Sequence, residues 1–257
     1  DLVEEVARIV GIENVPSVPM PRLHGITRTV LTEKQRRARR ARRVLAARGF
    51  TEAVTWSFIV RDQARHFGGG GDALELDNPI STEMSSMRPG LLPGLLAAAQ
   101  RNRNRGFRDV ALFELGQAYR GDKPEDQFMV AAGVRAGRTR IAGTGRHWDG
   151  KLEAADVFDV KSDVVALLAS FGFDAAKAQV TRDAPSWFHP GRSATLRLGP
   201  KVVLAHFGEL HPDTLKLLDV EAPAAAFEVY LGSLPAEKRK SRAKPPLEAL
   251  DLLPVTR

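Results

Sequence analysis

The sequence contains no cysteine among its 257 residues. This absence excludes a disulfide framework, a zinc site built on cysteine and catalysis by a thiol. No apolar run reaches the roughly 18 residues that a membrane span needs, so we expect no membrane partner. The chain also lacks an initiator methionine and a signal-peptide pattern, and it begins with a sequence typical of the middle of a helix. We therefore expect it to be a piece of a longer protein.

The common nucleotide and hydrolase motifs are missing as well. There is no GxxxxGK[ST], no GxGxxG after a strand, no HExxH and no GxSxG. The glycine run 68–71 lacks the lysine and the following helix of a phosphate loop, so it is interpreted as a plain loop. None of the six histidines has a metal-ligand spacing, and a structural role is favoured for His206 and His211. His189, next to two aromatic residues, could line a pocket, although a packed turn is favoured.

The positive charge of the chain is concentrated in one segment. The formal charge is +7, from 38 Lys and Arg against 31 Asp and Glu. The segment 31–48 holds eight basic residues and one acid, and thus the whole excess; 30 positive and 30 negative residues remain elsewhere. Two weaker basic clusters occur at 101–108 and 238–244, and the second, near prolines, is typical of a linker.

The basic segment is predicted to be a helix that ends at Gly49. Its apolar residues form a thin stripe, so one face packs and the rest meets solvent. Three interpretations stay open: a solvated arginine face, a protein interface, or contacts to RNA phosphates. The arginines that would make such contacts are Arg36, Arg39, Arg40 and Arg43.

The remaining pattern predicts an α+β fold. Further helices are expected at 1–10, 93–104, 157–171 and 212–218, and strands at 50–60, 73–76, 110–119, 128–135, 178–182, 193–198, 202–210 and 226–231. Several strands follow one another directly, which indicates a mostly antiparallel sheet flanked by helices.

Three acids lie together at the start of the chain. Asp1, Glu4 and Glu5 have the spacing i, i+3, i+4, so a helix places them on one face. Their mutual repulsion could be relieved by a cation, and oxygen ligands would suit Mg²⁺. The alternative is a solvated acidic helix start, which the helix dipole favours.

Several stretches resemble the β subunit of bacterial phenylalanine–tRNA ligase, a class II aminoacyl-tRNA synthetase. The first stretch resembles the family's DLVEEIARIYGYDNIP segment, with Val10 and Ile12 in place of tyrosines. Order and spacing match over essentially the whole chain. The stretches are DLVEEVARIVGIENVP (1–16), NPISTEMSSMRPGLLPGLL (78–96), LFELG (112–116), FDVKSD (158–163), HPGRS (189–193) and GELHP (208–212).

The resemblance implies a class II synthetase-like antiparallel sheet flanked by helices. It implies that 1–13 ends a preceding helical module, 14–30 is a connector, 31–234 is the synthetase-like core, and 235–257 is a linker toward an anticodon-binding module. The basic helix would occupy the place of the first class II motif, an interface element. The stretch AFEVYLGSL (226–234) lacks the glycine pattern and the arginine of the third motif. No catalytic residue is therefore expected.

The resemblance also implies cofactors and partners. In the family, a DxxEE set matching Asp1, Glu4 and Glu5 holds magnesium together with an upstream acid. The partners would be tRNA and an α subunit that uses ATP, in a cytoplasmic heterotetramer of two α and two β subunits. The family's editing module would lie upstream. The competing hypotheses are a stand-alone RNA-binding module and an active adenylating paralogue.

Overall fold

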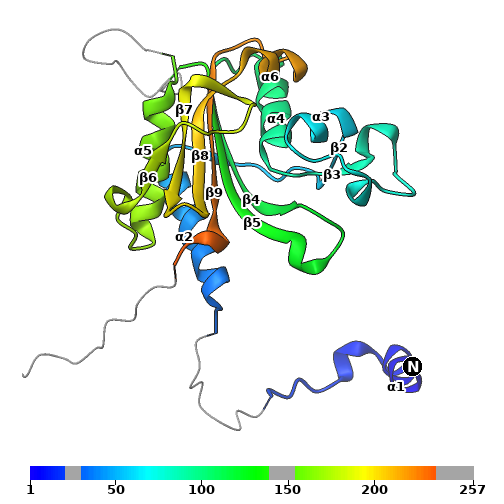
Figure 1. Ribbon diagram of the computed structural model, residues 1–257. Coiled ribbons are helices and arrows are strands. Elements are labelled where there is room, and N and C mark those ends of the chain that lie inside the picture. The colour runs from blue at the N-terminus through cyan, green and yellow to red at the C-terminus, as the bar shows by residue number, and fades with distance from the viewer. Residues whose placement is uncertain (21–29, 139–153, 236–257) are drawn as a thin grey trace, which may run out of the picture. The chain divides into compact units, whose positions relative to one another are not determined.

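The computed structural model describes residues 1–20, 30–138 and 154–235, which fall into two compact units, Asp1–Thr32 and the chain from Glu33 onward (Figure 1). The first unit contains helix α1 (Leu2–Val10) and the short 3-10 helix η1 (Ile12–Asn14). Helix α1 ends at Gly11, where φ is 97°. No residue of α1 is buried. Part of the predicted connector (21–29) and most of the predicted linker, with its basic cluster, lie outside the described residues.

The second unit is built on a seven-stranded sheet in the order β1-β4-β5-β9-β8-β7-β6. All neighbouring strands are antiparallel except β1 and β4, which are parallel. The predicted α+β fold with a mostly antiparallel sheet is thereby confirmed. The strands are β1 (Thr51–Glu52), β4 (Val110–Tyr119), β5 (Gln127–Ala136), β6 (Gln179–Thr181), β7 (Phe188–Leu198), β8 (Val202–Leu210) and β9 (Ala224–Tyr230).

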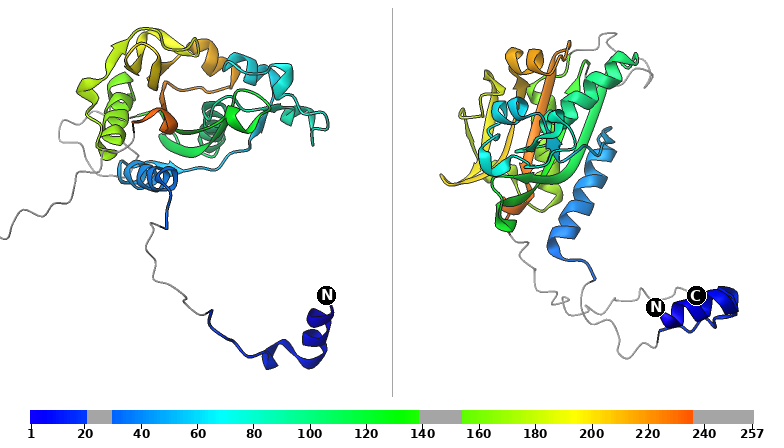
Figure 2. Two further views of the ribbon diagram at one scale, coloured as in Figure 1. Left: turned by 60° about the horizontal axis from the view of Figure 1, so that its bottom comes forward. Right: turned by 90° about the vertical axis from the view of Figure 1, so that its right-hand side faces the viewer.

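Helices cover both faces of this sheet (Figures 1 and 2). Helices α2 (Glu33–Ala47) and α5 (Val157–Ser170) pack on one face, and helix α4 (Leu92–Asn104) packs on the other, against β4 and β5. Helix α6 (Pro212–Leu217) connects β8 to β9. Strands covered on both faces must be apolar on both, which is why β4, β5 and β9 have nearly continuous apolar sequences. Within the described ranges, none of the helices combines the length and the apolar sequence that crossing a bilayer requires.

Two predicted strands are wrong. The stretch 50–60 is not one strand: β1 joins the large sheet, whereas β2 (Phe58–Ile59) pairs with β3 (Ser86–Met87) in a separate two-stranded sheet. The chain changes sheets at Thr55, whose hydroxyl bonds to a buried ion pair described below. The stretch 73–76 contains the end of a 3-10 helix, η2 (Asp72–Leu74), and makes one isolated bridge at Glu75. Strand propensity could not predict the structure of either stretch, because the pairing of a strand depends on its tertiary contacts.

Two short 3-10 helices and one α-helix complete the region beside α4. Helix α3 (Arg61–His66), which the sequence did not predict, precedes the glycine loop, and η3 (Thr82–Met84) precedes β3. The described chain also has 3-10 helices η4 (Pro124–Asp126), η5 (Ala175–Lys177) and η6 (Leu231–Ser233). The glycine run 68–71 is a loop, as predicted, and Gly69 lies so close to Pro89 that an added Cβ would come within 2.8 Å of its ring.

Candidate functional site

A row of polar side chains crosses the sheet on the face that α4 covers. Residues opposite one another in neighbouring strands point to the same face, so strand register defines the row. The residues in register are Glu114 on β4, Ala132 on β5, Glu228 on β9, His206 on β8, Thr195 on β7 and Thr181 on β6. Five of the six are polar or ionisable, in a sheet whose interior is otherwise apolar. Three members, Glu114, Glu228 and Thr195, are buried, and a buried polar group has to be paired or neutral to be tolerated.

The first member of the row is neutralised by an ion pair. Arg88, which follows β3, is 4% exposed, and its Nη1 donates to the Oε1 of Glu114 over 2.8 Å. Arg88 also donates to the hydroxyl of Thr55 and to the carbonyl of Gln117, at 2.9 and 3.0 Å. The Thr55 hydroxyl in turn donates to the other oxygen of Glu114 over 2.6 Å. The guanidinium group of Arg88 is therefore held by hydrogen bonds to other groups of this protein.

Glu228 and His206 are tolerated in a different way. Burial raises the pKa of Glu228 to about 7, and a hydrogen bond from the backbone N–H of Leu91 lowers it only in part. Burial lowers the pKa of His206 to about 4, so the imidazole is neutral at pH 7. Its Nδ1 lies 2.9 Å from the hydroxyl of Thr195. Tyr230 packs edge-on against His206, and burial raises the pKa of its phenol.

A cavity of about 230 Å³ opens beside Glu228 on the same face. Both tyrosines of the chain, Tyr119 and Tyr230, contribute to its wall. Arg120 lies at the wall with its guanidinium 4.3 Å from the centre of the Phe128 ring. The remaining wall residues are Phe67, Gly68, Leu74, Pro89, Gly90 and Trp187.

The predicted interface arginines lie on α2 and divide into two groups. Arg36, Arg39 and Arg43 are exposed, lie on the helix face opposite the buried Ala41 and Leu45, and pair with no side chain in the described parts of the chain. Arg40 is exposed too, but its Nη1 donates to the carbonyl of Ser170 over 2.9 Å. The neighbouring Arg37, Arg42 and Arg48 bond to other parts of the core.

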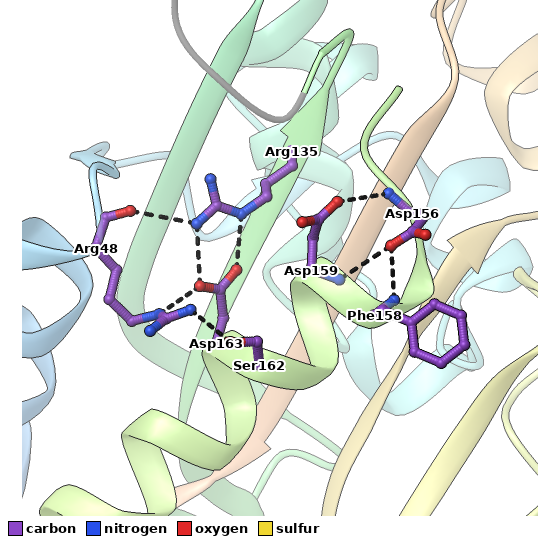
Figure 3. A network of polar contacts seen from close by, with 7 residues as sticks. All are labelled: Arg48, Arg135, Asp156, Phe158, Asp159, Ser162 and Asp163. Carbon is purple, nitrogen blue, oxygen red and sulfur yellow. Dashed lines mark hydrogen bonds and ion pairs between the residues drawn. The ribbon is translucent and has the colours of Figure 1, made fainter. Parts of the chain in front are cut away.

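Arg48 belongs to a buried junction, a group of charged side chains from separate parts of the chain, which is shown in Figure 3. The carboxylate of Asp163 is fully buried and lies between Arg48 and Arg135, which reach it over 2.5 and 2.7 Å. Arg135 also stacks 4.1 Å from the centre of the Phe50 ring. Helix α5, which carries Asp163, begins with a capping box formed by Asp156 and Asp159. This junction ties α2, α5 and β5 together, so it is structural.

The three N-terminal acids, predicted to bind magnesium, lie on exposed turns of the first unit. Glu5 forms an ion pair with Arg8 over 2.7 Å, and Asp1 and Glu4 are exposed. Their oxygen donors suit Mg²⁺. However, no three metal-binding side chains converge anywhere in the described residues, so this set does not form a site by itself. The magnesium role stays a prediction, and no chemical step is assigned to the metal.

The histidines have structural roles in the described residues, as predicted for two of them. His211 caps helix α6, since its Nδ1 accepts from the backbone N–H of Asp213 over 3.2 Å. His189 closes a turn by accepting from the N–H of Gly191 over 3.1 Å. The residue that sequence reasoning missed is Glu228. Its signal is a single acid inside the apolar strand AAAFEVY, where a buried charge needs an explanation.

The architecture is that of a class II aminoacyl-tRNA synthetase. A pyrrolysyl-tRNA synthetase structure from Desulfitobacterium hafniense matches with a TM-score of 0.54 and 15% identity, covering 76% of this chain and 65% of that one. A second structure of a synthetase of this name from the same organism matches with a TM-score of 0.54 and 14% identity, over 77% and 66% of the two chains. At this identity the likeness shows the fold alone.

The family is more specific. The sequence profile described as "Phenylalanyl tRNA synthetase beta chain CLM domain" matches residues 19–231, and the chain belongs to this family. Relatives named phenylalanine–tRNA ligase beta subunit include those of Bradyrhizobium diazoefficiens, 51% identical, and Nitrobacter winogradskyi, 53% identical. Both matches cover 100% of this chain and 32% of the relative. The chain thus spans about a third of the length of these relatives.

Proposed function

We propose that this chain is a noncatalytic, synthetase-like module of a phenylalanine–tRNA ligase β subunit. It would scaffold the α subunit, contribute to tRNA binding, and take part in a cytoplasmic assembly of two α and two β subunits. The α subunit would use ATP to charge tRNA with phenylalanine. The names and the extent of the matching relatives support this assignment.

The noncatalytic part of the proposal rests on the hydrogen bonds that the Arg88 side chain makes within the protein. In an active class II site an arginine must be available to the phosphates of ATP, and the family resemblance places the stretch Met87-Arg88-Pro89 in the region of the second class II motif. Arg88 is buried, and it donates to Glu114, to Thr55 and to backbone carbonyls. To reach a phosphate it would have to abandon a buried carboxylate, at a cost of about 3–5 kcal/mol. This argues against an adenylating enzyme.

The exposed arginines of α2 support the binding part of the proposal. Arg36, Arg39 and Arg43 form a ridge without internal partners in the described chain, so their charge is available to another molecule. A ridge on the interface element of the fold favours a subunit contact first and tRNA second. Magnesium, if held by Asp1, Glu4 and Glu5, would need a further carboxylate from outside this chain.

The test uses the full-length β subunit co-expressed with the α subunit. We expect the two to elute as one complex in gel filtration, and the triple variant Arg36→Glu, Arg39→Glu, Arg43→Glu to weaken that complex. The matched control reverses three exposed charges elsewhere: Lys177→Glu, Arg182→Glu and Lys201→Glu. This control should leave the complex intact.

The two alternatives make different predictions. If the ridge binds tRNA alone, the triple variant leaves the subunit complex unchanged and flattens the dependence of tRNA affinity on salt. The log–log slope should then fall by roughly 0.7–0.9 for each phosphate that the arginines no longer neutralise. If the chain is itself an adenylating enzyme, it catalyses ATP–pyrophosphate exchange without an α subunit. Exchange above background would overturn the noncatalytic assignment.

A further inference from the structure

A second cavity, of about 370 Å³, lies where helix α4 ends, β4 begins and β5 ends. We call it the arginine cavity, because three arginines contribute to its wall together with two acids. Arg108, Arg138 and Glu221 are exposed, so solvent reaches the cavity. The remaining charged residues of the wall are Arg103 and Asp109. The wall therefore has an excess of positive charge.

Two of the three arginines are unpaired. Within the described parts of the chain, the guanidinium groups of Arg108 and Arg138 form no ion pair or hydrogen bond, although two carboxylates share the wall. Asp109 instead accepts a hydrogen bond from the backbone N–H of Arg138 over 2.9 Å. Arg103 differs, because it lies in the last turn of α4, where the helix dipole favours a cation, and it donates to the carbonyl of Arg108. The fold explains Arg103 but not the other two arginines.

The strand register brings the two unpaired arginines near each other. Val110 of β4 lies opposite Ala136 of β5. Because these strands are antiparallel, the same register continued by two residues brings Arg108 opposite Arg138. The two chain segments are close at this point, since a Cβ added to Gly137 would lie 2.6 Å from the carbonyl oxygen of Arg108. Like charges on facing strand positions destabilise a fold, and an anion between them would replace their repulsion by two attractive contacts.

We propose that the arginine cavity binds the phosphate groups of an RNA backbone, with the guanidinium groups of Arg108 and Arg138 as the phosphate-binding donors. The inference rests on the tRNA binding proposed above and gives it a surface separate from the ridge on α2, because α2 and α4 cover opposite faces of the sheet. A guanidinium group holds a phosphate by paired, charge-assisted hydrogen bonds.

The surroundings of the cavity favour a polyanion over a single small ion. The segment 101–108 contains four arginines and no acid, and two of these arginines, Arg101 and Arg105, are exposed outside the cavity wall. A chain of phosphates can follow such a basic surface beyond the cavity, and each phosphate that is neutralised releases counter-ions. A small anion would use the cavity alone.

The test measures the affinity of the full-length β subunit, in complex with the α subunit, for phenylalanine tRNA between about 50 and 200 mM salt. If each arginine neutralises one phosphate, the double variant Arg108→Gln, Arg138→Gln should lower the log–log slope by about 1.4–1.8. Across this range the wild type should then lose about 7- to 12-fold more affinity than the variant. The matched control, Arg182→Gln with Lys201→Gln, removes two exposed positive charges near β6 and before β8, and it should leave the slope unchanged.

Two further measurements separate RNA binding from an effect on folding. Glu221→Gln removes an exposed negative charge from the wall and should raise tRNA affinity by about 1.4-fold to fivefold, the range of a single exposed charge interaction. Without RNA, the double variant should be at least as stable as the wild type in thermal unfolding, because it removes a like-charge contact and no hydrogen bond. A less stable double variant would show that the two arginines are structural and would overturn the inference.

The outcome for the wild type distinguishes this inference from the proposed function. If the wild-type complex binds tRNA and the double variant keeps the same slope, the arginine cavity is not an RNA site, whereas the proposed function stands. If the wild-type complex does not bind tRNA, both fail. A site for a small anion is the third outcome: sodium pyrophosphate, added at constant ionic strength, would bind the wild type but not the double variant, and tRNA affinity would be unchanged. That result would also overturn the inference.

Discussion

Glu228 and His206 lie directly opposite each other on β9 and β8, and burial shifts their pKa values in opposite directions. Both shifts favour the neutral form, because burial penalises the charged form of each side chain. The pair therefore carries no net charge at pH values between about 4 and 7. Two ionisable groups share one row of the sheet without forming an ion pair.

This relationship predicts opposite pH dependences for two variants. The folded protein holds the proton of Glu228 up to about pH 7, whereas the unfolded chain releases it near 4.5. The free energy of unfolding therefore falls by about 3 kcal/mol as pH rises through this range. For His206 the unfolded chain binds a proton below 6.5 and the folded protein does so only below about 4, so the free energy of unfolding rises by a similar amount.

We expect the two contributions largely to cancel between about pH 4.5 and 6.5 in the wild type. Relative to it, Glu228→Gln should become more stable as pH rises, and His206→Asn less stable, with slopes of up to about 1.4 kcal/mol per pH unit. Urea denaturation at a series of pH values across this range measures the slopes. A Glu228→Gln variant whose difference from wild type does not change with pH would contradict the prediction.

A second prediction concerns the ion pair of Arg88 and Glu114. Arg88→Met leaves a buried carboxylate with one remaining side-chain partner, Thr55, and should lower the free energy of unfolding by about 3–5 kcal/mol. Replacing both members, as Arg88→Met with Glu114→Leu, should restore a large part of this loss. The control is Arg192→Met, at a pair with Glu209 in which the arginine side chain is 53% exposed, where the loss should be about 0–1 kcal/mol. A double variant no more stable than Arg88→Met would argue against the pairing.

Sequence patterns predicted the long helices and strands of this fold but not the contacts between residues that are distant in the sequence. The helices α2, α4 and α5 and the strands from β4 to β9 show clear periodicity or continuous apolar runs, and their ends were predicted to within a few residues, apart from an earlier start of β7. The parallel pairing of β1 with β4 and the change of sheet at Thr55 were not predicted. At the change of sheet, Thr55 bonds to Arg88 and Glu114, which lie 33 and 59 residues away in the sequence.

The candidate sites, like the elements of the fold, were predicted from the sequence only in part. The arginines of α2 were apparent from composition, because one segment holds the entire net charge. Sequence could not separate the exposed Arg36, Arg39 and Arg43 from Arg37 and Arg48, whose partners lie more than a hundred residues away. The cavity was missed because its wall comes from several separate segments of the chain.

A third prediction concerns Asp163, which joins α5 to α2 and β5 (Figure 3). Asp163→Asn keeps the shape of the side chain but leaves the charges of Arg48 and Arg135 without their counter-ion. The free energy of unfolding should fall by about 3–5 kcal/mol. Asp62→Asn, at a pair with Arg65 in which the aspartate side chain is 80% exposed, is the control and should cost about 0–1 kcal/mol. Equal losses in the two variants would show that burial of Asp163 has no special effect.

A fourth prediction concerns Gly133 in β5, where two layers of the core approach closely. A Cβ at this position would come within 2.5 Å of the Phe227 ring and 3.1 Å of the Phe50 ring. Because both rings belong to the core between the sheet and the helices α2 and α5, neither can move without disturbing its neighbours. Gly133→Ala should therefore lower the free energy of unfolding by about 1–3 kcal/mol, although alanine is a better strand residue in isolation.

The matched substitution is Gly71→Ala, in the loop before η2, where φ is −71° and an added Cβ meets nothing within 4 Å. It should leave stability unchanged or raise it by about 0.4–1 kcal/mol, since alanine restricts the unfolded chain. Thermal and urea unfolding of the two variants side by side separates steric crowding from the general effect of replacing glycine. If Gly133→Ala proved as harmless as Gly71→Ala, the rings of Phe50 and Phe227 would have to be able to move apart, and the close packing of this core would be wrong.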